Sequence, residues 1–231
     1  MSFGNFDLTL GVSWYAAFLF SVVLHEAAHA WSAWKLGDPT AYRGGQATLD
    51  PIPHLRRAPV GMILVPVLSF ALMGWVIGWG CAPYNALWAQ RFPKRAALMA
   101  LAGPLANLFL VLIAALLIRL GMSLGYFHAP ESCGFSVVTE APSGGIAHGL
   151  AVLLSILFSL NLLLVAFNLL PLPPLDGAAV VSLFLTDGAA RTYLNVMRQP
   201  TFALVGILVA WKFLPSVFGA TFRVAFEVLY P

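Results

Sequence analysis

The sequence predicts an all-α polytopic membrane protein of about five to six membrane segments, one of them re-entrant or turning back on itself. Of its 231 residues, 60% are hydrophobic and only 9% are charged, whereas a soluble domain usually carries about 25% charged residues. The mean hydropathy is +0.87, and long apolar runs recur along the chain. This length allows a single membrane-embedded domain over residues 1–231.

The charge balance points to lipid as the surroundings of this domain. The formal net charge of +3 comes from Lys and Arg in the polar loops and gives no sign of nucleic-acid binding. Two cysteines without a C-x-x-C spacing indicate no redox chemistry. The composition does not specify an oligomeric state.

The first apolar segment covers about residues 11–36 and ends at the run Gly37-Asp38-Pro39, which is typical of a helix terminus. At 1.5 Å per residue it is roughly 39 Å long, enough to cross a bilayer with some tilt. Residues 40–57 are polar, with a glycine pair for a turn and a strand-like run at 46–49. They predict a short β-hairpin at the cytoplasmic surface.

The second apolar segment, about residues 59–79, is interrupted by Pro66, Gly74 and Gly78. These breaks favour a re-entrant or span-and-return course, in which protein must bury the irregular backbone. The later apolar segments are long enough to span: about 96–120, about 146–170, and from 201 onward.

Two features describe the C-terminal third. A short helix to about residue 185 is expected after residue 175, followed by a polar loop over 187–200. Pro215 interrupts the final apolar stretch, which predicts one span and an interfacial helix within about 201–230.

Basic residues predict the orientation. Eight Lys and Arg residues share three loops: 37–57, 91–95 and 187–200. The first ten residues and loop 121–145 carry none, so the positive-inside rule puts the N-terminus outside and the three basic loops in the cytoplasm. This orientation brings His25, His29 and Asp176 to the cytoplasmic ends of their segments, in a cell membrane of bacterial or archaeal type.

The first segment contains the run Leu-His-Glu-Ala-Ala-His at residues 24–29. Two histidines four positions apart on a helix lie one turn apart on one face, so both rings can reach one metal ion. Glu26 then lies beside the pair, where a general base belongs. Charged groups in a membrane helix cost roughly 2.5–3.5 kcal/mol each. The pattern therefore predicts a metal site; the alternative is a polar cluster solvated at the interface.

A catalytic zinc needs three protein ligands and one open position. The candidates for the third ligand are acidic or imidazole side chains: Asp38, Asp50, His54, Glu140, His148 and Asp176. Asp176 follows a membrane segment and a proline-rich stretch at 171–174, whose extended backbone at membrane depth is tolerated where it lines a cavity. Asp176 also suits the N-cap of the next helix, and the local sequence leaves both readings open.

Three ordered motifs resemble the site-2 protease family of intramembrane zinc metalloproteases. They are His-Glu-x-x-His at 25–29, Ala-Gly-Pro-x-x-Asn at 102–107 and Asn-x-x-Pro-x-x-x-x-Asp-Gly at 168–177. The resemblance covers about residues 11–185. The run Leu-Asp-Pro-x-x-His at 49–54 also looks like the minimal subgroup without PDZ or CBS domains, with aspartate where asparagine is common.

The resemblance implies roles for individual residues. One zinc ion would be held by His25, His29 and Asp176, with Glu26 as catalytic base. Asn168 would help to hold the scissile carbonyl or the oxyanion. An interhelical hydrogen bond is the alternative role for Asn168, and Asn107 and Asn161 fit that alternative better.

His54 has three readings: a loop histidine in water, a transient zinc ligand, or a gate over the site. The implied substrate is a transmembrane segment of another protein. It must unwind locally, because helical backbone groups are already hydrogen-bonded, and its strand could pair with the expected hairpin at 40–50.

The competing function is a metal-binding membrane protein without peptidase activity, such as a divalent-cation transporter or an inactive scaffold. A transporter usually builds its site between repeated halves, and the sequence shows no internal repeat and only one ligand-rich helix. A transporter would also have no need of Glu26 beside the histidines.

Overall fold

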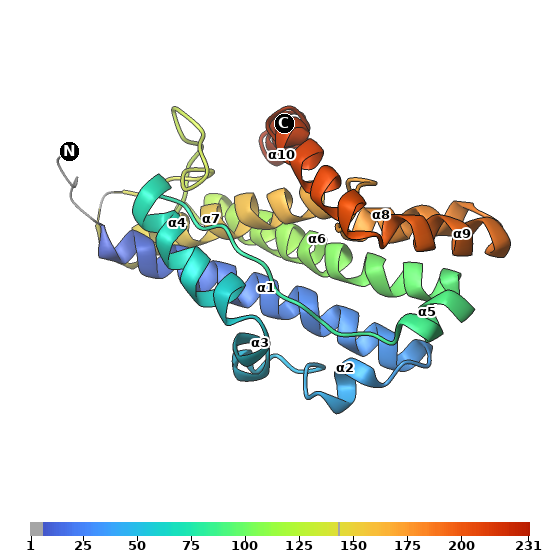
Figure 1. The fold of residues 1–231 in the computed structure, drawn as a ribbon. Coiled ribbons are helices and arrows are strands. Elements are labelled where there is room, and N and C mark those ends of the chain that lie inside the picture. The colour runs from blue at the N-terminus through green and yellow to red at the C-terminus, as the bar shows by residue number, and fades with distance from the viewer. Residues whose placement is uncertain (1–6, 143) are drawn as a thin grey trace.

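The computed structural model describes residues 7–142 and 144–231, and within them the chain is almost entirely helical (Figure 1). Four helices are long and apolar enough to cross a membrane: α1 (Leu8–Leu36), α6 (Pro93–Ser123), α7 (Gly145–Asn168) and α10 (Pro200–Leu229). A helix pair bent by 111°, Pro51–Arg57 with Val60–Met73, adds a fifth if it counts as one broken span. The prediction of an all-α protein with several membrane segments is confirmed.

Shorter elements connect these helices. They are α2 (Thr40–Arg43), α3 (Pro51–Arg57), the π-helical turn η1 (Val60–Leu64), α4 (Val65–Met73), α5 (Ala86–Arg91), α8 (Asp176–Val180), the 3-10 turn η2 (Val181–Phe184) and α9 (Asp187–Met197).

The β-hairpin expected within residues 40–57 is wrong. The described residues contain no sheet, and this region forms α2 and α3. Asp50 caps α3, because its Oδ1 accepts the Ile52 N–H at 2.9 Å and Pro51 occupies the first turn. An aspartate cap followed by proline is a strong helix start, and it outweighs the short strand-like run before it.

The core lies where α1 packs against α6 and α7. Trp14, Phe18 and Val22 of α1 meet Ile156 and Leu160 of α7 in one buried cluster. In Figure 1, α1, α6 and α7 run side by side as one layer, and α10 crosses outside them. The middle of α1 thus lies between α6 and residues 74–85, the non-helical stretch that follows α4.

Two expectations for the C-terminal third are wrong. The polar loop at 187–200 is largely α9, which starts where Thr186 Oγ1 accepts the Ala189 N–H at 3.4 Å. Pro215 does not divide the last stretch, because α10 continues through it to Leu229. The C-terminal end of α10 is tied to α6, because Arg119 Nη1 donates to the Leu229 carbonyl at 3.0 Å.

The second apolar segment turns back, as both courses predicted for it, re-entrant and span-and-return, require. Helix α4 ends at Gly74, whose φ is +75°, and residues 74–85 form an extended stretch that runs back along α1 to α5 (Figure 1). Phe70 of α4 packs against Gly11 near the start of α1. At the other end, the Asn85 N–H donates to Asp38 Oδ2 at 2.7 Å, beyond the end of α1.

Candidate metal centre

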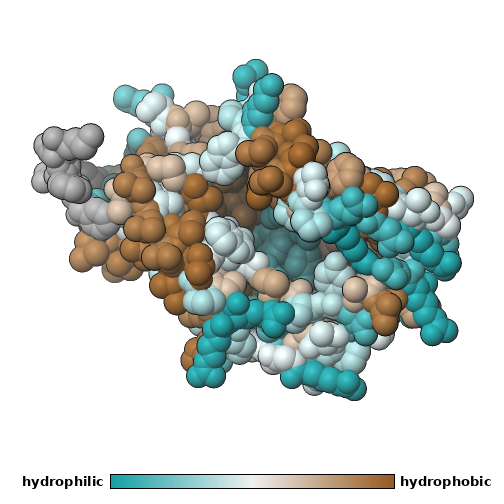
Figure 2. All heavy atoms as spheres, viewed as in Figure 1, coloured by the Kyte–Doolittle hydropathy of each residue, from teal (hydrophilic) through white to brown (hydrophobic). Residues whose placement is uncertain are grey.

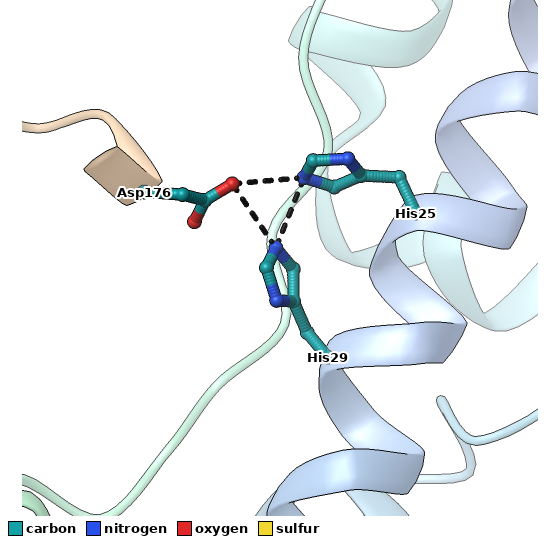
Figure 3. A group of neighbouring side chains, drawn as sticks. All are labelled: His25, His29 and Asp176. Atoms are coloured by element: carbon teal, nitrogen blue, oxygen red, sulfur yellow. Dashed lines mark hydrogen bonds and ion pairs between the residues drawn. The ribbon is translucent and has the colours of Figure 1, made fainter. Parts of the chain in front are cut away.

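Helix α1 presents His25 and His29 on one face, as their four-residue spacing requires. Their Nε2 atoms lie 2.9 Å apart and the rings are nearly perpendicular, at 86° (Figure 3). Both histidines and the neighbouring Glu26 are 7% exposed, so the group lies inside the protein.

Asp176 completes a three-residue group with these histidines. Its Oδ2 lies 3.2 Å from His25 Nε2 and 3.3 Å from His29 Nε2, and Figure 3 shows the carboxylate pointing between the two rings. The N-cap position of α8 belongs to Leu175, and Asp176 is the first helical residue. The carboxylate is therefore directed at the histidines and does not cap its own helix.

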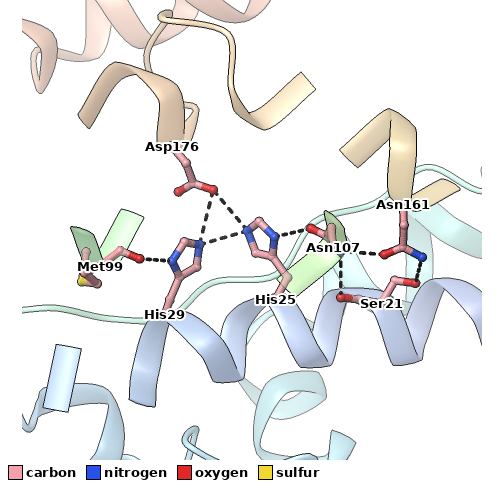
Figure 4. Close-up of polar contacts among 7 residues, drawn as sticks. All are labelled: Ser21, His25, His29, Met99, Asn107, Asn161 and Asp176. Carbon is pink, nitrogen blue, oxygen red and sulfur yellow. Dashed lines mark hydrogen bonds and ion pairs between the residues drawn. The ribbon is translucent and has the colours of Figure 1, made fainter. Parts of the chain in front are cut away.

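A buried polar chain fixes the far side of the His25 ring (Figure 4). His25 Nδ1 lies 2.6 Å from Asn107 Oδ1, and Asn107 Nδ2 donates to Asn161 Oδ1 at 2.8 Å. Asn161 Nδ2 in turn donates to Ser21 Oγ and to the Leu157 carbonyl, both at 2.8 Å. A carbonyl can only accept, so the direction of every donor in the chain is determined. The oxygen of Asn107 faces His25, and His25 carries its proton on Nδ1.

The second histidine is oriented in the same way. His29 Nδ1 lies 2.8 Å from the Met99 carbonyl oxygen, which must accept, so His29 is also protonated on Nδ1 (Figure 4). When the two rings are neutral, the form in which histidine binds a metal ion, both Nε2 atoms point lone pairs at each other and at the Asp176 carboxylate. Three such atoms that lie 2.9–3.3 Å apart are held together by a cation or by a shared proton.

This donor set fits zinc. Two imidazoles and one carboxylate are a usual catalytic zinc set, and bonds of about 2.0–2.2 Å in a tetrahedron separate ligand atoms by roughly 3.3–3.6 Å. The backbone carbonyl and the amide that hold the Nδ1 protons are the outer partners expected for metal-binding histidines. Within the described chain, no other group of three His, Cys, Asp or Glu side chains converges in this way.

Gly103 of α6 makes room for the group. A Cβ atom there would collide with His29 Nε2 and lie 2.6 Å from His25 Nε2. Asn107 lies one helical turn further along the same helix. The Ala-Gly-Pro-x-x-Asn run at 102–107 thus supplies both a gap for the rings and the acceptor for His25.

Glu26 faces the extended stretch 74–85 across a narrow gap. A Cβ atom on Gly80 would lie 2.5 Å from Glu26 Cγ and 2.7 Å from its Oε1. Figure 2 shows a hollow below α10, with hydrophilic side chains at its base and hydrophobic ones above it.

The other candidates for the third ligand lie elsewhere. Asp38 accepts from the Thr40 and Asn85 N–H groups, and Asp50 caps α3. Glu140 lies 4.0 Å from His128 in the loop after α6. His148 is exposed on α7.

His54 is not a loop histidine in water. It lies on α3, is 1% exposed, and its Nε2 donates to the Thr48 carbonyl at 3.1 Å. It is not part of the three-residue group. Its role as a gate or transient ligand stays a prediction.

Asn168 ends α7, and within the described residues its side chain makes no hydrogen bond. The amide is thus not used in helix packing. Asn107 and Asn161, by contrast, form the interhelical hydrogen bond expected of them. The contact of Asn107 with His25 was not predicted from the sequence, although an asparagine within a span is itself a sign of a buried polar partner.

Comparisons with known proteins agree with this chemistry. The sequence model of Peptidase family M50 matches residues 54–211. "Putative zinc metalloprotease YwhC" of Bacillus subtilis is 38% identical over 162 residues, which are 70% of this chain and 64% of that protein. "Putative zinc metalloprotease Rip2" of Mycobacterium tuberculosis is 32% identical over 212 residues, 91% of this chain and 70% of the relative.

A third relative, "Putative zinc metalloprotease Rip2" of Mycolicibacterium smegmatis, is 30% identical over 193 residues, 84% of this chain and 64% of its own length. The matched regions thus span about two thirds of each of these relatives, 64–70%. No solved structure matches the chain.

Proposed function

The chain belongs to peptidase family M50, the site-2 protease family, and from this premise we propose that it is a zinc-dependent intramembrane endopeptidase. The proposed reaction is hydrolysis of a peptide bond within or near a transmembrane segment of another membrane protein. One observation carries the proposal: His25, His29 and Asp176 bring three possible ligand atoms to one point, and Glu26 is the next residue after His25. Helices long and apolar enough to cross a membrane surround that point.

In this proposal, one zinc ion is held by His25, His29 and Asp176. Zinc supplies Lewis-acid chemistry and brings the pKa of water near to 7. The Glu26 carboxylate accepts the proton of the attacking water and then delivers it to the leaving amine. Glu26 is suited to this task because it is buried next to the ligands and makes no hydrogen bond within the described residues that would occupy its oxygens.

Asn168 is proposed to stabilise the oxyanion of the scissile carbonyl. Two facts support this role. The side chain leaves the C-terminal end of α7, eight residues before Asp176, and its amide has no hydrogen-bond partner in the described part of the chain. An uncharged donor held near developing negative charge can supply about 2.7–4 kcal/mol of stabilisation.

The extended stretch 74–85 is the proposed docking strand for an unwound substrate, in place of the absent hairpin. The N–H groups of Gly80, Cys81 and Ala82 make no hydrogen bond within the described residues. A peptide laid along this edge could use these donors, as in strand addition. Gly80 adjoins Glu26, so such a peptide would pass the general base.

The proposed orientation has the N-terminus outside and the active site toward the cytoplasm. The ligand-bearing half of α1 leads directly to Lys35 and to the basic residues of α2 and α3. Positive charge of this kind favours the cytoplasmic face. A bacterial cell membrane as the location agrees with the bacterial sources of the relatives.

The test uses Glu26→Gln, which keeps the volume of the side chain and removes its basicity. Wild-type and variant protein are each expressed in matched cells, whose membrane proteins are the candidate substrates. The membrane-protein fragments that accumulate in the two cultures are compared by mass spectrometry. Metal content of both purified proteins is measured by elemental analysis. We expect one zinc per chain in both and fragments only with the wild type. Equal fragments in both, or a wild type that binds no metal, would refute the proposal.

A further inference from the structure

A second pocket opens beside Asp176, on the side where α6, α8, α9 and the start of α10 meet. Its volume is about 230 Å³. Met99 and Ala100 of α6 form one wall, and Leu194 and Met197 of α9 form another. Asp176 lines this pocket and also belongs to the three-residue group. The pocket therefore adjoins the candidate metal centre.

Building on the proposed function, we propose that this pocket is a specificity subsite for a large apolar side chain of the substrate. That side chain, of leucine, methionine or phenylalanine, belongs to a residue that adjoins the scissile bond. Consecutive Cα atoms lie 3.8 Å apart, whereas Asp176 Oδ2 is within 3.3 Å of both histidine nitrogens. A substrate side chain that touches Asp176 therefore belongs to a residue close to the scissile bond, because Asp176 itself lies at the candidate metal centre.

The size of the pocket suits this occupant. A cavity of about 150 Å³ holds a benzene molecule, so 230 Å³ accommodates the side chain of phenylalanine or leucine. An alanine side chain would leave most of the space unfilled and lose the apolar contacts.

The chemistry of the lining favours an apolar occupant over a charged one. The charged residues that line the pocket are Asp176, which faces the histidines, and Arg198. The Arg198 guanidinium is already engaged at the rim, where it lies 5.7 Å from the Tyr84 ring centroid and donates to the Ala86 carbonyl at 3.5 Å. The remaining lining is Tyr84 together with alanine, leucine, methionine and proline, which favours apolar side chains.

The walls are held in place, so the pocket can discriminate by size. Lys94 Nζ donates to the Leu183 carbonyl at 2.7 Å and also to the Leu185 carbonyl, which ties α6 to the end of η2. On the opposite side, Gly206 of α10 lies flush against the Pro173 carbonyl, with no space for a side chain. Rigid packing of this kind makes added or missing methylenes costly.

The experiment uses purified protein in detergent micelles and a library of peptides made by digesting bacterial membrane proteins with trypsin. Mass spectrometry of the products gives residue frequencies on both sides of the cleaved bond. The pocket is narrowed by Ala203→Leu, on α10, and widened by Met197→Ala, on α9. Neither residue is a proposed ligand or base. Ala220→Leu, at an exposed position of α10, is the matched control.

We expect wild type and Ala220→Leu to favour Leu, Met and Phe over Ala at one adjoining position by about tenfold or more. Ala203→Leu should reduce that preference about tenfold, and Met197→Ala should shift it toward Phe and Trp. An unchanged profile in both pocket variants, or enrichment of Asp and Glu, would overturn the subsite.

A binding measurement separates this inference from the proposed function. Glu26→Gln protein is mixed with a transmembrane peptide of leucine and alanine that carries one diazirine-leucine. Light activates the diazirine, and the cross-linked residues are identified by mass spectrometry. Cross-links on Leu194 and Met197 that disappear when Ala203→Leu is added support the subsite even if no peptide is ever cleaved. Cross-links that avoid α9 contradict it, even if cleavage occurs.

Discussion

Replacement of Asn107 by leucine should weaken zinc binding although Asn107 is not itself a ligand. Its Oδ1 accepts the His25 Nδ1 proton at 2.6 Å, and the side chain is fully buried. Leucine has a similar size but no acceptor, so the Nδ1 proton would be buried without a partner, at a cost of about 1–3 kcal/mol. The ring can avoid this cost by moving the proton to Nε2, which blocks the atom that faces the other two ligands.

Either outcome penalises metal binding, and loss of such an outer partner typically costs about 10- to 100-fold in metal affinity. That range equals about 1.4–2.8 kcal/mol, in agreement with the hydrogen-bond figure. Zinc affinity is measured on chelator-stripped protein by competition with a chromophoric chelator. Thermal unfolding of the metal-free protein reports whether the fold survives. Asn195→Leu, at an exposed position of α9, is the control.

Asn107→Asp provides a sharper comparison. Aspartate keeps the acceptor for His25, but its second oxygen faces Asn161 Oδ1, because the Leu157 carbonyl holds the Asn161 amide in its orientation. We expect this variant to bind zinc nearly as well as the wild type, although a buried charge lowers its stability. A folded Asn107→Leu protein with affinity within threefold of wild type would refute the reasoning, as would equal losses in both variants.

The glycines at the site give two further predictions. Gly103→Ala places a methyl group against His29 Nε2 and should abolish stoichiometric zinc, measured by elemental analysis; retained zinc would contradict the tight approach of α6. Gly80→Ala places its methyl group about 2.5 Å from Glu26 Cγ. Because the Glu26 side chain is flexible, it should move away from the methyl group. We expect this shift to leave zinc content and thermal stability unchanged and to reduce peptide cleavage at least tenfold. Unchanged cleavage would show that Glu26 does not need its observed position. Gly149→Ala, on α7 with no atoms near its Cβ position, should alter neither property.

Several features could be predicted because they depend on neighbouring residues or on composition alone. A spacing of four on a helix brings His25 and His29 together without reference to the rest of the chain. Low charge and long apolar runs are enough to predict a membrane protein. Local signals failed where two of them competed. The strand-like run at 46–49 lay beside the Asp50 cap, and Pro215 lay within a helix whose far end is held by Arg119.

Only the tertiary structure decided which acidic side chain meets the histidines. Asp176 is separated from His29 by more than a hundred residues, and six candidates had suitable chemistry. Packing of α6 between α1 and α8 brings Asp176 to the histidines and directs Asn107 at His25, and the return of stretch 74–85 along α1 lays Gly80 against Glu26. The sequence by itself determined a helix with two imidazoles and an adjacent carboxylate, since backbone geometry repeats every turn. The partners of those groups come from distant segments, and only the packing of whole helices brings such segments within contact distance.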